Sequence, residues 1–206
     1  MISIVDYGVG NTGALLNMFD YLGIAAELVD SAESISHAHK LVLPGVGSFD
    51  KAMNTLRTKG LVEALNTAVL AHSVPVLGVC LGMQLLARRS EEGVEAGLGW
   101  LNADVKLIKL PSESNLKVPN MGWINTQVVR ESELLKTANA ETRFYFDHSY
   151  HVVCDDPSDV LATIDYGSPL CCAVAHGNIA GVQFHPEKSH RHGMSMLSAF
   201  AAMEHT

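Results

Sequence analysis

Cys80 stands at the junction of two kinds of sequence. A strand-forming run at 74–79 ends there and a helix-forming run at 81–88 begins, with Gly78 and Gly82 on either side. A strand, a tight turn that carries a nucleophile and a helix together form a nucleophile elbow, here with sulfur in place of oxygen. Only glycine leaves room for the close backbone approaches of such a turn. The pattern predicts a reactive cysteine, although by itself it also fits a buried structural cysteine.

His185 and Glu187 form a second candidate, separated by Pro186. Proline excludes helix and favours an extended backbone before it. In an extended chain, residues two apart point the same way, so the imidazole and the carboxylate can face one site. A carboxylate can hold an imidazole in one tautomer, and an imidazole can take the proton of a cysteine. The plain alternative is a surface histidine and glutamate at the end of a strand.

A third candidate is the short apolar run at 41–43, which leads into Pro44, Gly45, Val46 and Gly47. A glycine-rich turn after a strand can point the backbone N–H of Val46 or Gly47 at a developing oxyanion. The N–H of Leu81, directly after the nucleophile, would be the second donor. Read alone, the segment is an ordinary strand-to-helix turn.

Together these three segments resemble the class I (triad-type) glutamine amidotransferases, whose triad is Cys, His and Glu, and they follow the same order along the chain. Within that superfamily the sequence is similar to the glutaminase subunits of imidazole glycerol phosphate synthase. The segments that carry this narrower resemblance are 6–11, 119–123, 146–150 and 187–189. The resemblance covers essentially the whole chain. One departure is Asp147, where the family usually has an apolar residue; an acid there could alter the protonation of His148.

The resemblance implies a mechanism and a set of site residues. Cys80, His185 and Glu187 would be the catalytic triad that hydrolyses the side-chain amide of L-glutamine. The resemblance implies no cofactor for this subunit and no metal, and it implies that ammonia passes to a (β/α)8-barrel cyclase in a heterodimer. Glutamine would contact Gly45, Gln84, Glu92, Ser149 and Tyr150, and the partner-facing side would carry Asn11, Asn120, Met121, Trp123, Tyr145 and Lys188.

Composition restricts the remaining classes. The 206 residues suit one α/β domain, which we expect over 1–206, and the formal charge of −8 argues against nucleic acid and anionic membranes as partners. The 4 cysteines include no CxxC pair, which fits a reducing cytosol. The first residues read as a strand and not as a signal peptide. The apolar stretch at 68–87 is interrupted by His72, Pro75 and Gln84, so the elbow explains it better than a membrane span.

The hydrophobic pattern predicts an α/β fold. Its first half alternates strands and helices, which indicates a mostly parallel central sheet with flanking helices. Its second half is mainly strands joined by turns, several of them antiparallel, as in the flavodoxin-like fold of class I amidotransferases. The expected strands are 2–5, 26–29, 40–43, 74–79, 104–108, 124–129, 144–149, 160–164, 170–175 and 179–184. The expected helices are 11–22, 49–71 with a break at Gly60, 81–88 and 190–204.

Three other functions remain open from the residues alone. The segment 8–13 fits G-x-G-x-x-G after a strand and before a helix, and Asp30 ends the next strand, which is the context of an NAD site. A glutaminase subunit of another amidotransferase, or a glutaminase-like module that only binds and regulates a partner, would share many of the same features. Zinc is disfavoured, since no nearby Cys or carboxylate completes a compact site with the histidines. Those histidines are His148, His151, His190 and His192.

Overall fold

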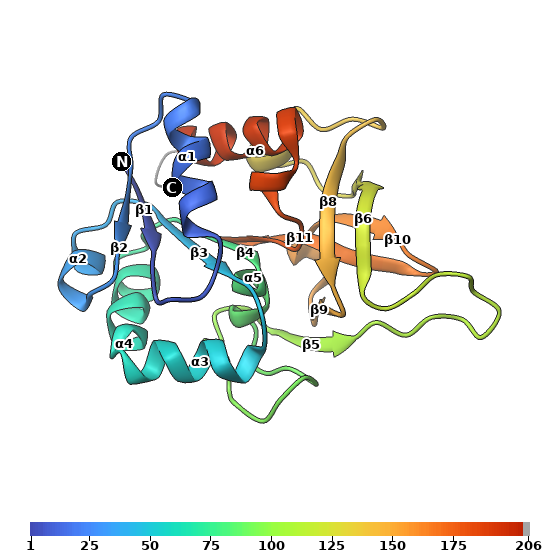
Figure 1. Ribbon diagram of the computed structural model, residues 1–206, viewed down its shortest axis with the longest axis horizontal. Helices are drawn as coiled ribbons and strands as arrows, with labels where there is room; N and C mark the ends of the chain where they lie inside the picture. Colours follow the sequence, from blue (N-terminus) through green and yellow to red (C-terminus); the bar gives the residue numbers. More distant parts are fainter. Residues whose placement is uncertain (204–206) are drawn as a thin grey trace.

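The computed structural model describes residues 1–203 and has strands and helices in the predicted alternation (Figure 1). The strands are β1 Ile2–Val5, β2 Ala26–Val29, β3 Leu41–Gly45, β4 Val76–Cys80, β5 Ala103–Leu107, β6 Asn120–Asn125, β7 Gln127–Val128, β8 Arg143–His148, β9 Tyr150–Cys154, β10 Val160–Asp165, β11 Pro169–His176 and β12 Ile179–Val182. The helices are α1 Thr12–Tyr21, α2 Ala32–Ser36, α3 Phe49–Thr58, α4 Leu61–Asn66, α5 Leu81–Leu85 and α6 His190–Ala202, with a π-helical turn, η1, at Thr67–Ala71. Short 3₁₀ turns are η2 Glu133–Leu135, η3 Pro157–Asp159 and η4 Pro186–Lys188.

An 8-stranded sheet runs through both halves of the chain in the order β2-β1-β3-β4-β12-β11-β10-β7. The strands from β2 to β12 in this order are parallel, and β11, β10 and β7 add antiparallel pairs. The sheet therefore has the mostly parallel centre and the antiparallel second half that the sequence predicts. Two further ladders, β5 with β9 and β6 with β8, lie beside it.

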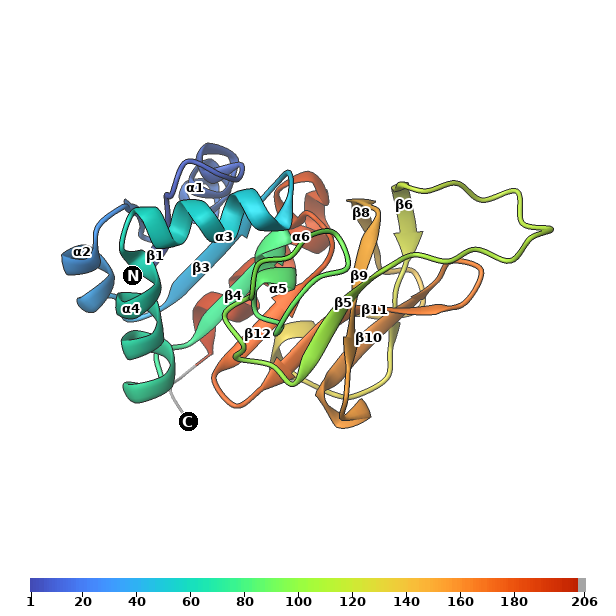
Figure 2. The same ribbon diagram turned by 90° about the horizontal axis from the view of Figure 1, so that it is seen from below.

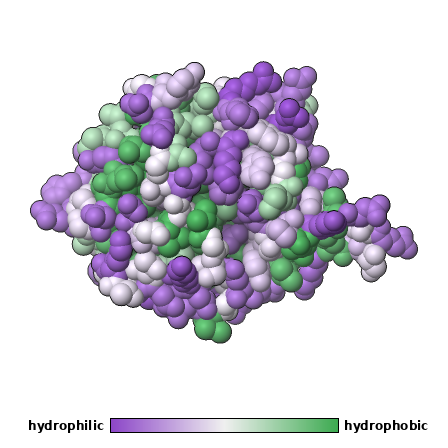
Figure 3. Space-filling view, in the orientation of Figure 1, coloured by the Kyte–Doolittle hydropathy of each residue, from purple (hydrophilic) through white to green (hydrophobic). Residues whose placement is uncertain are grey.

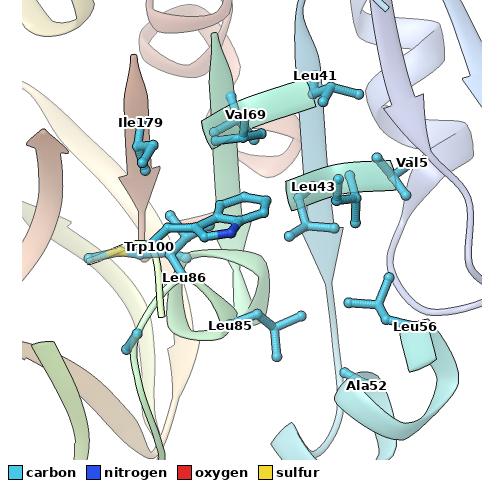
Figure 4. Packing of buried hydrophobic residues seen from close by; sticks show 14 of the residues in the cluster. Val5, Leu41, Leu43, Ala52, Leu56, Val69, Leu85, Leu86, Trp100 and Ile179 are labelled. Carbon is cyan, nitrogen blue, oxygen red and sulfur yellow. The ribbon is translucent and has the colours of Figure 1, made fainter. Parts of the chain in front are cut away.

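Helices cover both faces of the sheet. In Figures 1 and 2, α1 and α6 lie on one face, and α3, α4 and α5 lie on the other. The side chains of β1 alternate accordingly, since Ile4 packs with the α1 and α6 side chains, whereas Val5 packs with those of α3 to α5. Figure 4 shows residues of the second of these clusters, among them Leu43 on β3, Leu56 on α3 and Trp100 beside Leu86. Two apolar layers thus fix the ends of β3 and β4, where the candidate site begins.

Several element boundaries differ from those expected. The expected helix at 81–88 ends at Leu85, because the chain then pairs with β5: Arg88 N–H donates to Ala103 O at 3.0 Å. The structure also contains α2 and β9, which the sequence pattern does not mark, and β6 begins at Asn120 rather than at 124. The predicted break at Gly60 is confirmed, since this residue has φ +69° between α3 and α4. Helix α6 ends at Ala202, and residue 204 of the expected helix lies outside the described residues.

Within residues 1–203, no helix is long and apolar enough to cross a membrane. The apolar stretch at 68–87 is divided between η1, β4 and α5, as the elbow interpretation requires. Figure 3 shows hydrophilic residues over much of one face, with separate hydrophobic patches, one of them over β6 and the loop before it. The large exposed apolar side chains of that region are Leu116, Val118, Met121 and Trp123.

Candidate active site

The turn at Cys80 has the geometry of a nucleophile elbow. Cys80 ends β4 with φ 54° and ψ −112°, and α5 begins at the next residue. A Cβ on Gly78 would lie 2.7 Å from the carbonyl oxygen of Gly82, and a Cβ on Gly82 would lie 1.8 Å from the carbonyl oxygen of Leu43. No side chain fits at these two positions. The predicted reason for the glycines is therefore confirmed, and a strained backbone presents the Cys80 sulfur at the end of the sheet.

His185 and Glu187 form the expected pair. The Nδ1 of His185 donates to Oε1 of Glu187 at 2.8 Å, and the two side chains are only 5 % and 2 % exposed. The His185 N–H donates to Tyr145 O at 2.9 Å, and the Ser189 hydroxyl donates to His185 O at 2.6 Å. Because Nδ1 is used by the carboxylate, Nε2 is the nitrogen left for Cys80.

The charge of His185 is set by its two neighbours. Burial by itself would lower the pKa of this imidazole. The Cys80 sulfur and the Glu187 carboxylate outweigh burial, because both hydrogen-bond to the ring and favour its protonated form, and they raise the pKa of His185 to about 10. At neutral pH the imidazole is therefore protonated between a sulfur and a carboxylate. This arrangement can stabilise a thiolate and supply a proton to a leaving group.

A cavity of about 330 Å³ opens above Cys80. Its wall combines a nucleophile, a protonated imidazole, carboxylates and backbone groups at the carboxyl ends of parallel strands, where ligands bind in open α/β sheets. Most of the predicted catalytic and glutamine-contacting residues meet there. The lining residues are Val46, Gly47, Cys80, Leu81, Gln84, Glu92, Pro119, Asp147, His148, Ser149, Tyr150, His185 and Lys188.

Glu92 is fixed by the first turn of α3. The Phe49 N–H donates to Glu92 Oε2 at 2.8 Å, and the Asp50 carboxylate accepts the N–H groups of Val94 and Glu95 at 3.0–3.1 Å. Helix α3 directly follows the loop at 45–47. Its first turn therefore holds both Glu92, the candidate binding group for the substrate, and the candidate oxyanion loop. The family resemblance suggested Glu92, but the role of Asp50 needs the fold, because Asp50 lies 42 residues earlier in the chain.

The loop after β3 is packed from both sides. Gly45 does not line the cavity; a Cβ there would lie 2.9 Å from the N of Gly82, so glycine allows β3 and α5 to meet. The fully buried Tyr7 donates its hydroxyl to Pro44 O at 2.8 Å. Gly47 has φ +90°, which favours glycine, and a Cβ added there would meet open space. The loop is thus anchored at its start and adjustable at Gly47.

The predicted partner-facing residues gather mainly around β6 and β8. Trp123 stacks on His190 with ring centroids 5.3 Å apart, and its edge meets Tyr145 at 6.1 Å. The Lys188 ammonium lies 5.3 Å from the Tyr145 ring centre, and Met121 is 61 % exposed. Exposed aromatic and apolar side chains of this kind are typical of protein interfaces. Asn11 lies apart from them, exposed immediately before α1.

Asn120 is placed differently. It is 1 % exposed, and its side-chain amide lies 3.0 Å from Nε2 of His148. Alternation along β6 explains this, because Asn120 points inward where Met121 and Trp123 point out. His148 is held on its other side by Tyr150 O, 2.7 Å from Nδ1. Asn120 is therefore buried behind the cavity wall, which it contacts through His148.

Burial, not Asp147, decides the protonation of His148. Burial lowers the pKa of this imidazole to about 4, and repulsion from His151 and His185 acts in the same direction. Asp147 faces Met121 across the β6–β8 ladder and lines the cavity as a carboxylate. The expected effect of Asp147 on the His148 pKa is not among these causes, because adjacent residues of a strand point to opposite faces.

Two of the other histidines considered as zinc ligands contact aromatic rings. His190 stacks on Trp123, and His192 lies against Phe144. Within residues 1–203, no group of three or more His, Cys, Asp or Glu side chains is arranged to hold a metal ion.

In the G-x-G-x-x-G segment, a Cβ on Gly10 would lie 3.0 Å from Pro44, so this glycine lets the first loop pack against the end of β3.

Comparison with known proteins agrees with this geometry. The family "Glutamine amidotransferase class-I" matches residues 3–203. The imidazole glycerol phosphate synthase subunit HisH 2 of Pseudomonas aeruginosa is 47 % identical over 203 residues, covering 98 % of this chain and 100 % of the relative. The subunit HisH of Bdellovibrio bacteriovorus is 45 % identical over 202 residues, covering 98 % of this chain and 99 % of the relative.

Solved structures show the same fold at lower identity. A glutamine amidotransferase crystal structure has a TM-score of 0.74 at 20 % identity, covering 98 % of this chain and 100 % of that one. A glutamine amidotransferase from Thermotoga maritima has a TM-score of 0.63 at 18 % identity, covering 97 % and 81 %. The full-length match to the family and the high identity to the curated relatives favour the amidotransferase interpretation over a dinucleotide site. The chain belongs to the class-I glutamine amidotransferases and, within them, to the HisH subunits of imidazole glycerol phosphate synthase.

Proposed function

We propose that Cys80, His185 and Glu187 carry the glutaminase reaction of an imidazole glycerol phosphate synthase. Membership of the HisH family makes the chain the subunit that hydrolyses glutamine for histidine biosynthesis. The observation that supports these residues is the pairing of a protonated His185 with both Cys80 and Glu187 in one cavity.

The proposed chemistry has two halves. The Cys80 thiolate attacks the side-chain amide carbon of glutamine, and the new C–S bond creates an oxyanion that accepts N–H groups of Leu81 and of Val46 or Gly47. His185 gives its proton to the amide nitrogen, the C–N bond breaks, and ammonia leaves a glutamyl thioester. His185 then takes a proton from water, the hydroxide attacks the thioester, and the C–S bond breaks to release glutamate.

We propose that polar side chains in the wall of the cavity bind the amino-acid end of glutamine. Glu92 carries a carboxylate suited to the substrate ammonium, and Gln84 offers its side-chain oxygen because both N–H groups of its amide are donated to the protein. Ser149 and Tyr150 also line the cavity, and we propose that their backbone adds contacts to glutamine. Gly45 serves packing beneath this site.

The test of the catalytic assignment is Cys80→Ala. We expect glutamate release to fall to the uncatalysed level while circular dichroism and thermal unfolding stay near wild type. Cys154→Ala is the matched control, because Cys154 is a partly exposed thiol outside the cavity and its loss should leave the rate unchanged. Undiminished glutaminase activity in Cys80→Ala would falsify the assignment.

We further propose that the acceptor of ammonia is a (β/α)8-barrel cyclase subunit that forms a heterodimer with this chain in the cytosol. The support is the cluster formed by the exposed Met121, Trp123 and Lys188 with the half-buried Tyr145, beside the cavity. A compartment that keeps thiols reduced suits a reactive Cys80. We also propose that the chain is one domain, since a single sheet takes strands from both halves.

The partner proposal is tested by titrating purified candidate cyclase subunits into the chain and measuring complex formation and glutaminase rate. We expect a stable complex and a rate that rises with the partner and again with the partner's phosphorylated ribotide ligand. Equal rates for the chain alone and for both mixtures would exclude a partner-controlled enzyme. Full activity without binding would indicate an independent amidase.

A further inference from the structure

Gln183 is a buried polar side chain with no role in the proposed glutaminase steps. It lies two residues before His185 and is 0 % exposed. Its backbone N–H donates to Cys172 O at 2.9 Å, which holds it against β11. Because residues two apart in an extended chain point the same way, Gln183 and His185 are both directed toward Cys80.

Both ends of the Gln183 amide are occupied. Its Nε2 donates to the Cys80 sulfur at 3.8 Å, and its Oε1 accepts from Gln84 Nε2 at 3.0 Å. Gln84 Nε2 also donates to Tyr150 O at 3.0 Å. The Gln183 side chain therefore joins the nucleophile to a residue of the proposed glutamine site.

The network leaves only one orientation for the Gln183 amide. The Tyr150 carbonyl can only accept, so Gln84 must present its NH₂ group to it and to Gln183. Gln183 must then present its oxygen to Gln84 and its NH₂ to the sulfur. Reversing the Gln183 amide would place two donors against each other and an oxygen against Cys80.

We propose that Gln183 is a positioning residue that holds the Cys80 sulfur and the Gln84 side chain in register. Its N–H donor, placed against the sulfur, favours thiolate over thiol, because hydrogen bonds to a charged acceptor are stronger than those to a neutral one. Its oxygen fixes the Gln84 amide so that the Gln84 oxygen faces the substrate. This inference rests on the proposed glutaminase function for its effect on Gln84, but its effect on Cys80 is independent of glutamine.

The first experiment measures alkylation of Cys80 by iodoacetamide as a function of pH. Trypsin places Cys80 on the peptide 60–88 and the other three cysteines on 144–188, so mass spectrometry reads Cys80 separately. In Gln183→Met, which keeps the length of the side chain but donates nothing, we expect the rate at pH 7 to fall roughly tenfold and the pH midpoint to rise by about one unit. Gln183→Glu should raise the pH midpoint of alkylation at least as far, since a carboxylate replaces the N–H donor.

Gln127→Glu is the matched control for Gln183→Glu. It makes the same chemical change at an exposed residue of β7, far from the cavity. Its alkylation profile should equal that of the wild type. In steady-state assays Gln183→Met should also raise KM for glutamine as well as lower kcat, because Gln84 loses its acceptor. An unchanged alkylation profile in folded Gln183→Met would overturn the proposal, and a loss of thermal stability alone would assign Gln183 a merely structural role.

A second measurement uses the unsubstituted side chain and so stays decisive if the variants fail to fold. The chain has three glutamines, at 84, 127 and 183, so side-chain ¹⁵N labelling of glutamine gives three amide signals. We expect the Gln183 signal to titrate together with the Cys80 thiol in the wild type and not in Cys80→Ala. A Gln183 signal that is independent of Cys80 would overturn the proposal even where alkylation cannot be compared. If the wild-type chain showed this coupled titration of Gln183 and Cys80 but no glutaminase activity, the result would instead count against the proposed function.

Discussion

At the scale of single residues, the site depends on charges that are paired before substrate arrives. His185 is protonated because a sulfur and a carboxylate lie on either side of the ring, although burial opposes that charge. His148, which is equally enclosed but bonded to a carbonyl and an amide, is neutral. Two buried histidines of one cavity thus differ in charge because their hydrogen-bond partners differ.

Glu187→Gln should keep the shape of the triad and lose its charge. The amide oxygen can still accept from His185 Nδ1, but it no longer stabilises the imidazolium. We expect kcat to fall roughly 10²- to 10⁴-fold with a much smaller change in KM. Glutamate release under saturating glutamine measures this. Glu63→Gln on the outer helix α4 is the control, and equal rates for Glu187→Gln and wild type would exclude Glu187 from the triad.

The raised pKa of His185 also predicts how stability depends on pH. The pKa is about 6.5 in the unfolded chain and about 10 in the folded one. The folded state therefore binds a proton more tightly, and this contribution, on the order of a few kcal/mol, is fully present below pH 6.5 and is lost as pH rises through 10. Urea unfolding of wild type and Glu187→Gln at pH 6.5, 8 and 10 should show the wild-type advantage shrinking as pH rises. An advantage that is constant over this range would contradict the assigned charge.

At the scale of elements, the site is made by loops that follow buried strands. β3 and β4 lie side by side and end in the loop at 45–47 and in the elbow, so neighbouring strands deliver the oxyanion donors and the nucleophile. Close packing between these elements requires Gly45, Gly78 and Gly82. Conformational freedom, by contrast, is retained at Gly47.

We expect a peptide flip at Gly47 to turn the oxyanion donor toward the site when the partner stimulates the enzyme. Gly47→Ala should then reduce the ratio of stimulated to unstimulated glutaminase rates. Alanine at φ +90° is strained, whereas the surrounding space is open, so the substitution acts on the backbone alone. Alanine disfavours the conformation with φ +90° at residue 47. If that conformation is the resting one, the unstimulated rate should rise, and if it is the active one, the stimulated rate should fall. The ratio of the two rates shrinks in both cases. A donor that is lost costs roughly 10²- to 10³-fold in rate. Gly177→Ala, at φ +55° in open space, is the matched control, and an unchanged ratio in Gly47→Ala would exclude a switch at this loop.

The same substitution should have opposite effects in two helices. Gly82→Ala places a methyl group 1.8 Å from the Leu43 carbonyl oxygen in α5, so we expect a loss of at least about 3 kcal/mol or failure to fold. Gly13→Ala in α1 meets no atom within 4 Å and should stabilise the chain by up to about 1 kcal/mol. Urea unfolding compares the two. A tolerated Gly82→Ala would mean that β3 and α5 can separate.

At the scale of the whole molecule, one end of the sheet carries both the cavity and the exposed aromatic cluster. Trp123 is held between His190 and the Arg143 guanidinium, which lies 5.7 Å from its ring centre, so its orientation is fixed before any partner binds. An exposed tryptophan that is already ordered loses little entropy on binding. The cluster is thereby suited to a stable interface next to the site that would release ammonia.

Trp123→Ala should therefore weaken association with a cyclase partner. A buried tryptophan at the centre of an interface contributes about 2 kcal/mol or more, which corresponds to a Kd roughly 30-fold higher. Isothermal titration measures this, and the basal glutaminase rate of the chain alone should remain. Tyr21→Ala is the control, since Tyr21 is 77 % exposed at the far end of α1. Equal loss in both variants would place the partner elsewhere.

The sequence alone determined the parts that depend on local patterns. Alternating strands and helices predicted the parallel sheet, glycines around Cys80 predicted the elbow, and the spacing of His185 and Glu187 predicted a shared direction. Each follows from backbone sterics and strand periodicity, which act over a few residues. The shortened helix α5 and the unexpected strand β9 show the limit, since pairing between distant segments decided both.

Only the tertiary structure decided which residues meet across the chain. Asn120, expected near the partner-facing side, is buried against His148, and the role that we propose for Gln183 depends on its amide lying between Cys80 and Gln84. Asp50 supports the Glu92 loop from another element. Such contacts depend on how strands are ordered in the sheet and on which side chains burial forces into hydrogen bonds. Neither is encoded in local spacing, because both follow from packing the whole chain.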